Sequence, residues 1–212
     1  MAGTITALRA QKKRHDRVNV YLDGRYAFGL KDIVAARLRV GQQLTDEEIA
    51  ELKQQDTLEE TYNSALNFLS YRPRSTAEVR WNLQRKGVPN PVIESVIERL
   101  TRVGLLDDAS FAEYWVEQRE RFKPRSAQML RHELREKGVA SHHIEQALES
   151  LDEAESARRL ASQRVQRYAH LEREEFWRKM TGYLQRRGFR YETIKPIVEE
   201  LWQEIEHAHS NS

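Results

Sequence analysis

Hydrophobic side chains recur along most of the chain at three- and four-residue steps, the spacing that places them on one face of a helix. The stretch 71–88, YRPRSTAEVRWNLQRKGV, is the clearest case. Pro73 disfavours helix at the residue before it, Ser75 opens a capping-box sequence, and Gly87 suits the left-handed residue that ends a helix. The pattern therefore predicts one short amphipathic helix between the serine and the glycine.

Two further copies of this pattern follow along the chain. The second reads FKPRSAQMLRHELREKGV at 122–139, and a weaker third copy ends in YLQRRGF at 183–189. Recurrence at such a period is typical of helical repeat proteins, whose units stack on their neighbours. The residues expected to be buried in the three helices are Val79 and Leu83 with Ala77 or Trp81, then Leu130 and Leu134, then Met180 and Leu184.

The N-terminal region carries the only pattern typical of strands. Residues 18–22, VNVYL, alternate at period two, and the Asp23-Gly24 pair that follows is a strong signal for a two-residue hairpin. A lone hairpin is marginal in water, so we expect residues 4–8 to add a third strand. We expect this small sheet to pack on the helix that follows it.

Three helices are predicted between this sheet and the first proline junction. The first runs from Asp32 to Leu38, and the second begins at the capping box of Thr45. The polar residues 54–56 interrupt the apolar pattern and predict a break, after which a new helix runs to about Ser70.

These signals predict a mainly α-helical fold in which tandem three-helix repeats follow a small N-terminal extension with a β-hairpin or three-stranded sheet. Three repeats with helices about 20 Å long would make an extended object. The expected divisions are the extension at 1–55, repeats at 56–104, 105–151 and 152–206, and a polar tail at 207–212.

Composition narrows the environment and the chemistry. The chain has 212 residues, no cysteine, and 35 basic against 33 acidic residues. Disulfides and thiolate metal sites are therefore excluded, and we expect a cytoplasmic protein. No run approaches the roughly 20 apolar residues of a membrane span, so we expect no membrane partner.

No constellation of residues typical of catalysis stands out. Carboxylates are spread along the chain at the spacing of helical salt bridges. Of the seven histidines, two form the adjacent pair His142-His143 and two lie in the polar tail, and neither pair has the spacing of a metal site. No glycine-rich phosphate loop occurs. We therefore expect no enzyme, no metal and no cofactor, and we expect a monomer.

Basic residues recur around the proline junctions. Arg74 and Arg125 follow the prolines at helix starts, where acidic residues are normally preferred. Two interpretations stay open: these arginines contact a partner, or they pair with carboxylates of a neighbouring repeat. The candidate binding residues are Arg72, Arg74, Arg80, Arg85, Lys86, Lys123, Arg125, Arg131 and Arg135. The third copy holds Arg186, Arg187 and Arg190, with Arg178 and Lys179 upstream.

A second basic run lies in the segment between the first strand and the hairpin. It comprises Lys12, Lys13, Arg14 and Arg17. As an exposed loop, it either contacts phosphate or an acidic protein or serves solubility alone.

The stretch 71–88 and the continuation VIESVIERLTRVGLLDDASFAEYWVEQR at 92–119 resemble the RecX family, whose members regulate the RecA recombinase. The GLLDD–FA element and the R-[KE]-KG helix ends carry the resemblance most specifically, and the hairpin at 18–30 is similar to the N-terminal extension of longer members. The resemblance implies an elongated curved array of three-helix units that binds the RecA filament on single-stranded DNA. It implies inhibition of filament extension, ATP hydrolysis and strand exchange, and a place in homologous recombination, DNA repair and the SOS response. Binding roles would fall on Arg72, Arg74, Arg80, Arg125 and Arg131.

Two other functions remain open. The stretch 83–96, LQRKGVPNPVIESV, is similar to a helix-turn-helix DNA-binding module. Its would-be recognition helix carries Glu94 and Glu98 and has almost no side chains suited to reading bases. The other alternative is a protein-only helical scaffold in which the arginines form internal salt bridges.

Overall fold

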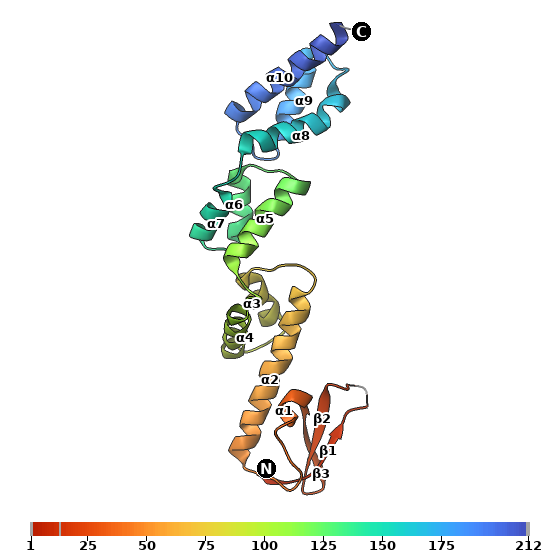
Figure 1. The fold of residues 1–212 in the computed structure, drawn as a ribbon, viewed down its shortest axis with the longest axis vertical. Coiled ribbons are helices and arrows are strands. Elements are labelled where there is room, and N and C mark those ends of the chain that lie inside the picture. Colours follow the sequence, from red (N-terminus) through yellow and green to blue (C-terminus); the bar gives the residue numbers. More distant parts are fainter. Residues whose placement is uncertain (1, 13, 211–212) are drawn as a thin grey trace. The chain divides into compact units, whose positions relative to one another are not determined.

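The computed structural model describes residues 2–12 and 14–210, so Lys13 and the last two residues of the predicted tail lie outside the described residues. The chain is mainly helical and begins with one small antiparallel sheet (Figure 1). The predicted fold class, tandem three-helix groups after a small sheet, is confirmed. The chain divides into two compact units, Met1–Arg72 with Val79–Leu106 and Pro73–Glu78 with Asp107–Ser212, and each is described on its own.

The N-terminal sheet contains the predicted hairpin. Asp23 and Gly24 have φ values of 47° and 80°, the left-handed pair that a tight mirror-image hairpin turn requires. A fourth strand of two residues, Gln43–Leu44, pairs with Gly3 and Thr4 and was not predicted, because two residues are too few to show an alternating pattern. The strands are β1 (Gly3–Ala10), β2 (Arg17–Leu22), β3 (Arg25–Lys31) and β4 (Gln43–Leu44), in the antiparallel order β3-β2-β1-β4.

The first predicted helix is shorter than expected, since α1 covers only Asp32–Ala35. Leu38 lies beyond its end but is still buried in the core of the sheet, with Ile5, Val20 and Leu30. Its apolar position thus reflects burial and not helix.

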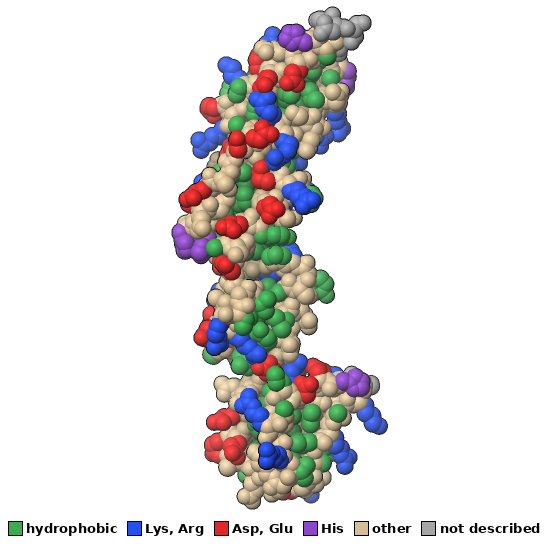
Figure 2. All heavy atoms as spheres, viewed as in Figure 1, with side chains coloured by type: hydrophobic (Ala, Val, Ile, Leu, Met, Phe, Trp, Pro, Cys, Tyr) green, Lys and Arg blue, Asp and Glu red, His purple; other side chains and the backbone are tan. Residues whose placement is uncertain are grey.

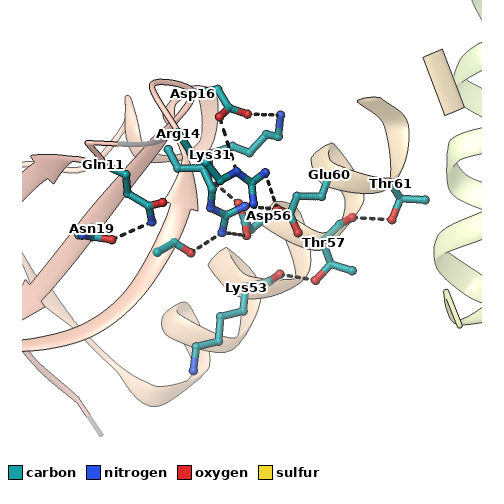
Figure 3. Close-up of polar contacts among 12 residues, drawn as sticks. Gln11, Arg14, Asp16, Asn19, Lys31, Lys53, Asp56, Thr57, Glu60 and Thr61 are labelled. Atoms are coloured by element: carbon teal, nitrogen blue, oxygen red, sulfur yellow. Dashed lines mark hydrogen bonds and ion pairs between the residues drawn. The ribbon is translucent and has the colours of Figure 1, made fainter. Parts of the chain in front are cut away.

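The predicted break at 54–56 is wrong, because α2 runs without interruption over Asp46–Leu69. Asp56, the polar residue that suggested the break, is buried against the sheet. Its carboxylate accepts hydrogen bonds from Arg17 Nη2 at 2.8 Å and from the backbone N–H of Lys31 at 2.5 Å (Figure 3). A buried carboxylate is tolerated when it is paired and hydrogen-bonded in this way.

The same contacts correct the expectation for the N-terminal basic run. Arg17 is not an exposed loop residue: it lies in β2, is 9% exposed, and pairs with Asp56 and Glu60. Arg14 is exposed and also reaches Glu60, at 3.3 Å (Figure 3). Arg17 therefore holds the sheet on α2.

Trp81 does not join the predicted stripe of Val79 and Leu83, because its side chain is 58% exposed.

Each three-helix group has its own buried cluster of matching apolar residues. The first group comprises the later part of α2, α3 (Thr76–Arg85) and α4 (Asn90–Arg102), around Val79, Leu83, Ile93 and Leu100. The second comprises α5 (Asp108–Phe122), α6 (Ala127–Glu136) and α7 (Ser141–Leu148), around Phe111, Leu130, Leu134 and Ile144. The third comprises α8 (Glu153–Tyr168), α9 (Arg173–Gln185) and α10 (Tyr191–Ser210), around Phe176, Met180, Leu184 and Ile194.

The serine of each proline junction receives the glycine turn of the next copy. Ser75 Oγ donates to the carbonyl of Lys137 at 2.6 Å, and the backbone N–H of Ser126 donates to the carbonyl of Arg187 at 3.1 Å. In both cases the next residue along the chain is a glycine with positive φ, Gly138 at +73° and Gly188 at +88°. The matching glycines therefore shape the contact between successive copies as well as the end of a helix.

Candidate functional site at the proline junctions

Each proline junction joins two helices through a short turn whose start and end are capped. In the second junction α5 ends at Phe122, and the backbone N–H of Lys123 donates to the carbonyl of Arg119 at 2.8 Å. Ser126 then caps α6 by accepting the N–H of Met129 at 3.2 Å. In the first junction Ser75 and Glu78 form the predicted capping box. The capping residues thus determine where the side chains between the helices lie.

An exposed aromatic residue opens both junctions, and sequence reasoning did not select it as a binding residue. Tyr71 is 84% exposed and Phe122 is 66% exposed, although most large apolar side chains of the repeats are buried. A cation follows each of them, Arg72 in the first junction and Lys123 in the second. The available signal was that both aromatics stand outside the apolar stripe at the same repeat position. Exposed aromatics beside cations are typical anchors of binding surfaces.

Arg125 lies in an internal network centred on Glu133 of α6. Glu133 Oε1 is 2.7 Å from Arg125 Nη1, and Glu133 Oε2 is 2.7 Å from Arg119 Nε and 2.8 Å from Trp115 Nε1. The Glu133 side chain is only 11% exposed. Arg119 and Lys137 also contact the Trp115 ring, at 4.5 and 4.2 Å from its centroid. The position of Arg125 at a helix start is therefore explained by a carboxylate within the same repeat.

The first junction differs at this point. Arg74 occupies the place of Arg125, but Asn82 stands where Glu133 stands in the second copy. The first copy of the motif therefore lacks the particular carboxylate that binds Arg125 in the second. Arg72 and Arg74 are both half-buried.

Arg80 and Arg131 form the same bidentate ion pair in two copies. Arg80 Nε and Nη2 each donate to Glu94 at 2.9 Å, and Arg131 donates to Glu145 at 2.7 and 2.8 Å. Hydrogen bonding to Arg80 lowers the pKa of Glu94, and hydrogen bonding to Arg131 lowers the pKa of Glu145. These pairs join the second and third helices of the first and second repeats, as the interpretation of internal salt bridges requires.

The remaining candidate cations lie on exposed parts of the helices. Arg85 lies over the exposed ring of Trp81, with 4.6 Å between its guanidinium carbon and the ring centroid. Lys86 Nζ donates to Ser64 Oγ at 2.6 Å. Lys123 and Arg135 are exposed. Figure 2 shows acidic and basic side chains interspersed over the second and third repeats on its visible face.

The helix-turn-helix alternative finds little support in the geometry of α4. Ile93, Val96, Ile97 and Leu100 of this helix are buried in the repeat core. Glu94 is occupied by Arg80 and Glu98 is exposed. The outer face of α4 thus presents carboxylates, which repel DNA phosphates.

Two other kinds of site are not found in the part of the chain that the structure describes. Within 2–12 and 14–210 no group of three or more His, Cys, Asp or Glu side chains is arranged to hold a metal ion. None of the helices in the same ranges is long and apolar enough to span a membrane.

Tandem three-helix groups after a small sheet define a helical-repeat protein, and comparison with known proteins identifies which kind. The sequence profile described as Regulatory protein RecX N-terminal domain matches residues 3–45. Those described as the first, second and third three-helix domains of RecX match 62–100, 107–148 and 152–198. The chain belongs to the RecX family of regulatory proteins.

Individual relatives agree with the profiles. Regulatory protein RecX of Bacillus subtilis (strain 168) is 33% identical over 202 residues, which cover 93% of this chain and 76% of that protein. Regulatory protein RecX of Oceanobacillus iheyensis is 32% identical over 207 residues, with coverages of 93% and 76%. A solved structure described as regulatory protein RecX matches with a TM-score of 0.74 and 28% identity, over 94% of this chain and 100% of that chain. The crystal structure of RecX from Lactobacillus salivarius matches with a TM-score of 0.60 and 29% identity, over 69% and 97%.

Proposed function

We propose that the protein regulates RecA by binding the RecA filament on single-stranded DNA, and that it inhibits filament extension, ATP hydrolysis and strand exchange. Membership in the RecX family supports regulation of RecA. The observation that carries the proposal is the exposed aromatic residue followed by a cation at both proline junctions. A partner that repeats along its length can receive such pairs at successive positions.

The candidate residues have two roles in this proposal. Exposed aromatics supply contact area at low cost in conformational entropy, and neighbouring cations add contacts to carboxylates or phosphates. Arg80, Arg125 and Arg131 hold the helices that present these groups, through Glu94, Glu133 and Glu145. The direct contacts are proposed for Tyr71, Arg72, Arg74, Arg85, Lys86, Phe122, Lys123 and Arg135.

The proposal extends to the setting of this activity. The protein acts by binding and not by catalysis, as a monomer in the cytoplasm, within homologous recombination, DNA repair and the SOS response. The functional divisions are proposed to follow the sequence repeats, with the extension at 1–55, repeats at 56–104, 105–151 and 152–206, and a tail at 207–212.

The test is RecA-catalysed ATP hydrolysis on single-stranded DNA with stoichiometric purified protein. We expect hydrolysis and strand exchange to fall, and inhibition to weaken as salt rises because cationic contacts are screened. The double variant Arg72→Gln/Lys123→Gln should inhibit less. Arg158→Gln/Arg173→Gln serves as the control, because it removes the same charge from exposed ion pairs of the third repeat. Unchanged hydrolysis and strand exchange with the parent protein would sink the proposal.

The internal ion pairs favour one alternative, the protein-only scaffold. In that case Arg72→Gln/Lys123→Gln would leave any effect on RecA as it is in the parent protein. A duplex-reading module would instead bind double-stranded DNA without RecA and lose that binding on changes in α4. The same assays therefore distinguish the scaffold and the duplex-reading module from the proposed function.

A further inference from the structure

A hollow of about 660 Å³ lies beside strand β3, where the β2–β3 hairpin meets the first half of α2. Its floor is apolar, because Leu22, Phe28 and Ile49 line it. All three residues also belong to the core that joins the sheet to the helix. The volume is within the range of ligand pockets, which are mostly apolar with a few polar groups at chosen places.

A bulge in β3 brings a second aromatic ring to this hollow. Val20 of β2 pairs with Phe28, but the next residue, Tyr21, pairs with Tyr26, so Ala27 is an extra residue in β3. Neighbouring residues of a strand point to opposite faces, so Phe28 and Tyr26 lie on opposite faces of the sheet. In a regular strand, two residues this far apart would share one face. The bulge therefore leaves the Tyr26 ring 60% exposed at the hollow, whereas Phe28 is 8% exposed.

Two cations border the hollow and lack a carboxylate partner. Arg25 and Lys53 are exposed, and neither forms an ion pair with any residue that the structure describes. Lys53 points away from the ion pairs between α2 and the sheet (Figure 3), and its Nζ is 5.4 Å from the centroid of the Phe28 ring. Asp23 is the one acidic residue among the described lining residues, and it accepts a hydrogen bond from the backbone N–H of Thr4 at 3.1 Å. The hollow is thus apolar at its floor and positive at its rim.

This combination selects the kind of occupant. An inorganic anion would need the cations but not the apolar floor. A protein segment with a large apolar side chain between carboxylates uses both, because the side chain fills the hollow and the carboxylates pair with Arg25 and Lys53. A second copy of the chain paired along β3 is disfavoured, since a bulge and a charged residue on an edge strand both oppose edge-to-edge pairing.

We propose that the hollow beside β3 docks a protein segment that carries a large apolar side chain flanked by carboxylates. The residues proposed to contact RecA belong to the three-helix repeats, and none of them is among the described lining residues of this hollow. The site therefore goes beyond the proposed function and does not depend on it. The N-terminal sheet acts as a docking module in addition to the repeats.

The test is fluorescence anisotropy of a labelled peptide of about 10 residues, in which a Leu-Phe pair stands between two Glu-Asp pairs. The peptide is titrated with the full chain in the absence of RecA and DNA. Arg25→Gln/Lys53→Gln removes the rim cations, and Tyr26→Ser removes the exposed ring. The control Arg37→Gln/Arg39→Gln removes the same charge from exposed positions of the same unit that do not line the hollow. Circular dichroism confirms that all four proteins are folded.

We expect the parent protein to bind the peptide, and each hollow variant to bind it about tenfold more weakly at low salt. The parent's affinity should fall as salt rises, and that of the rim variant should fall less, because fewer charges remain to be screened. The control should bind within about twofold of the parent. Absence of binding by the parent, parental affinity in either hollow variant, or an equal loss in the control would overturn the proposal.

Comparison probes test the chemistry of the occupant. A peptide with Lys in place of the acidic residues, and one with Gly-Ser in place of Leu-Phe, should both bind about tenfold more weakly than the original peptide. Equal binding of either peptide would overturn the proposal. Displacement of the original peptide by oligothymidylate would assign the hollow to nucleic acid instead. A dimer in analytical ultracentrifugation that Tyr26→Ser dissociates would assign it to a second copy of the chain, and both results would overturn the proposal.

Discussion

At the scale of single residues, the repeated arginines differ in whether their repeat provides a carboxylate at the position of Glu133. Arg125 is held by Glu133, whose second oxygen also binds Arg119 and Trp115. Arg74 has the same place in the motif, but the first repeat has Asn82 at the position of that glutamate. A residue that opposes the helix dipole in two copies therefore has a structural cause in at least one of them.

Removal of the Glu133 carboxylate should destabilise the second repeat. Glu133→Ala leaves two half-buried guanidinium groups and the Trp115 N–H without their shared acceptor, so the free energy of unfolding should fall by about 3 kcal/mol. Chemical denaturation followed by tryptophan fluorescence measures this change. Glu136→Gln is the control, because Glu136 lies on the same helix and is 68% exposed. A loss of similar size in the control would show that the network is not the cause.

The bidentate pairs predict a defined dependence on pH. The pKa values of Glu94 and Glu145 are lowered by hydrogen bonds from Arg80 and Arg131, below an ordinary value of 4.5. A carboxylate with a lowered pKa in the folded state stabilises the protein above its unfolded pKa, and this stabilisation is lost as the pH falls through the folded value.

The double variant Glu94→Gln/Glu145→Gln should therefore be less stable than the parent above about pH 5, and the difference should shrink as the pH falls below about 4.5. Denaturation curves across this range measure it. Glu98→Gln/Glu149→Gln, at exposed positions without ion-pair partners among the described residues, should follow the parent protein. A difference that stays constant with pH would contradict the assignment.

At the scale of the elements, the turns that end the helices also join one copy to the next. Gly87 and Gly138 occupy the same repeat position and have φ values of +76° and +73°. A Cβ on Gly87 would meet nothing within 4 Å, whereas a Cβ on Gly138 would lie 2.4 Å from Cβ of Ala77. The second glycine is therefore required for contact as well as for conformation.

This difference makes the two glycines a matched pair. Gly87→Ala should cost about 1 kcal/mol of unfolding free energy, from the left-handed backbone alone. Gly138→Ala should cost clearly more, because strain and a clash add. The second change Ala77→Gly should recover part of the loss in Gly138→Ala, as a double-mutant cycle would show. Equal costs at the two glycines would contradict the contact.

The elements could be predicted from sequence wherever the cause was local. The hairpin at Asp23-Gly24, the capping boxes of Thr45 and Ser75, and the apolar stripes follow from the preferences of neighbouring residues. The continuity of α2 could not be predicted, because the buried Asp56 carboxylate is stabilised by hydrogen bonds from Arg17 and Lys31, which are distant in the chain. The carboxylate partners of the candidate arginines were missed for the same reason, since ion pairing between helices depends on the fold.

At the scale of the whole molecule, the copies share one architecture but present different surfaces. The first two junctions carry an exposed aromatic residue and a cation, and the third copy has Glu172 in that place. The repeat cores and the Ser–Gly contacts account for the apolar residues and the glycines of the motif. Neither accounts for Tyr71 and Phe122, so these two residues carry the proposed contact with RecA.

The most direct measurement is inhibition of RecA ATP hydrolysis on single-stranded DNA by the variant Tyr71→Ala/Phe122→Ala. Both side chains are exposed, so the variant should keep the parent's unfolding free energy within about 1 kcal/mol. We predict that it needs about tenfold more protein than the parent for equal inhibition, because exposed aromatic anchors carry much of a binding energy. Arg158→Gln/Arg173→Gln should inhibit like the parent protein. Inhibition by a folded Tyr71→Ala/Phe122→Ala variant that equals that of the parent would contradict the account.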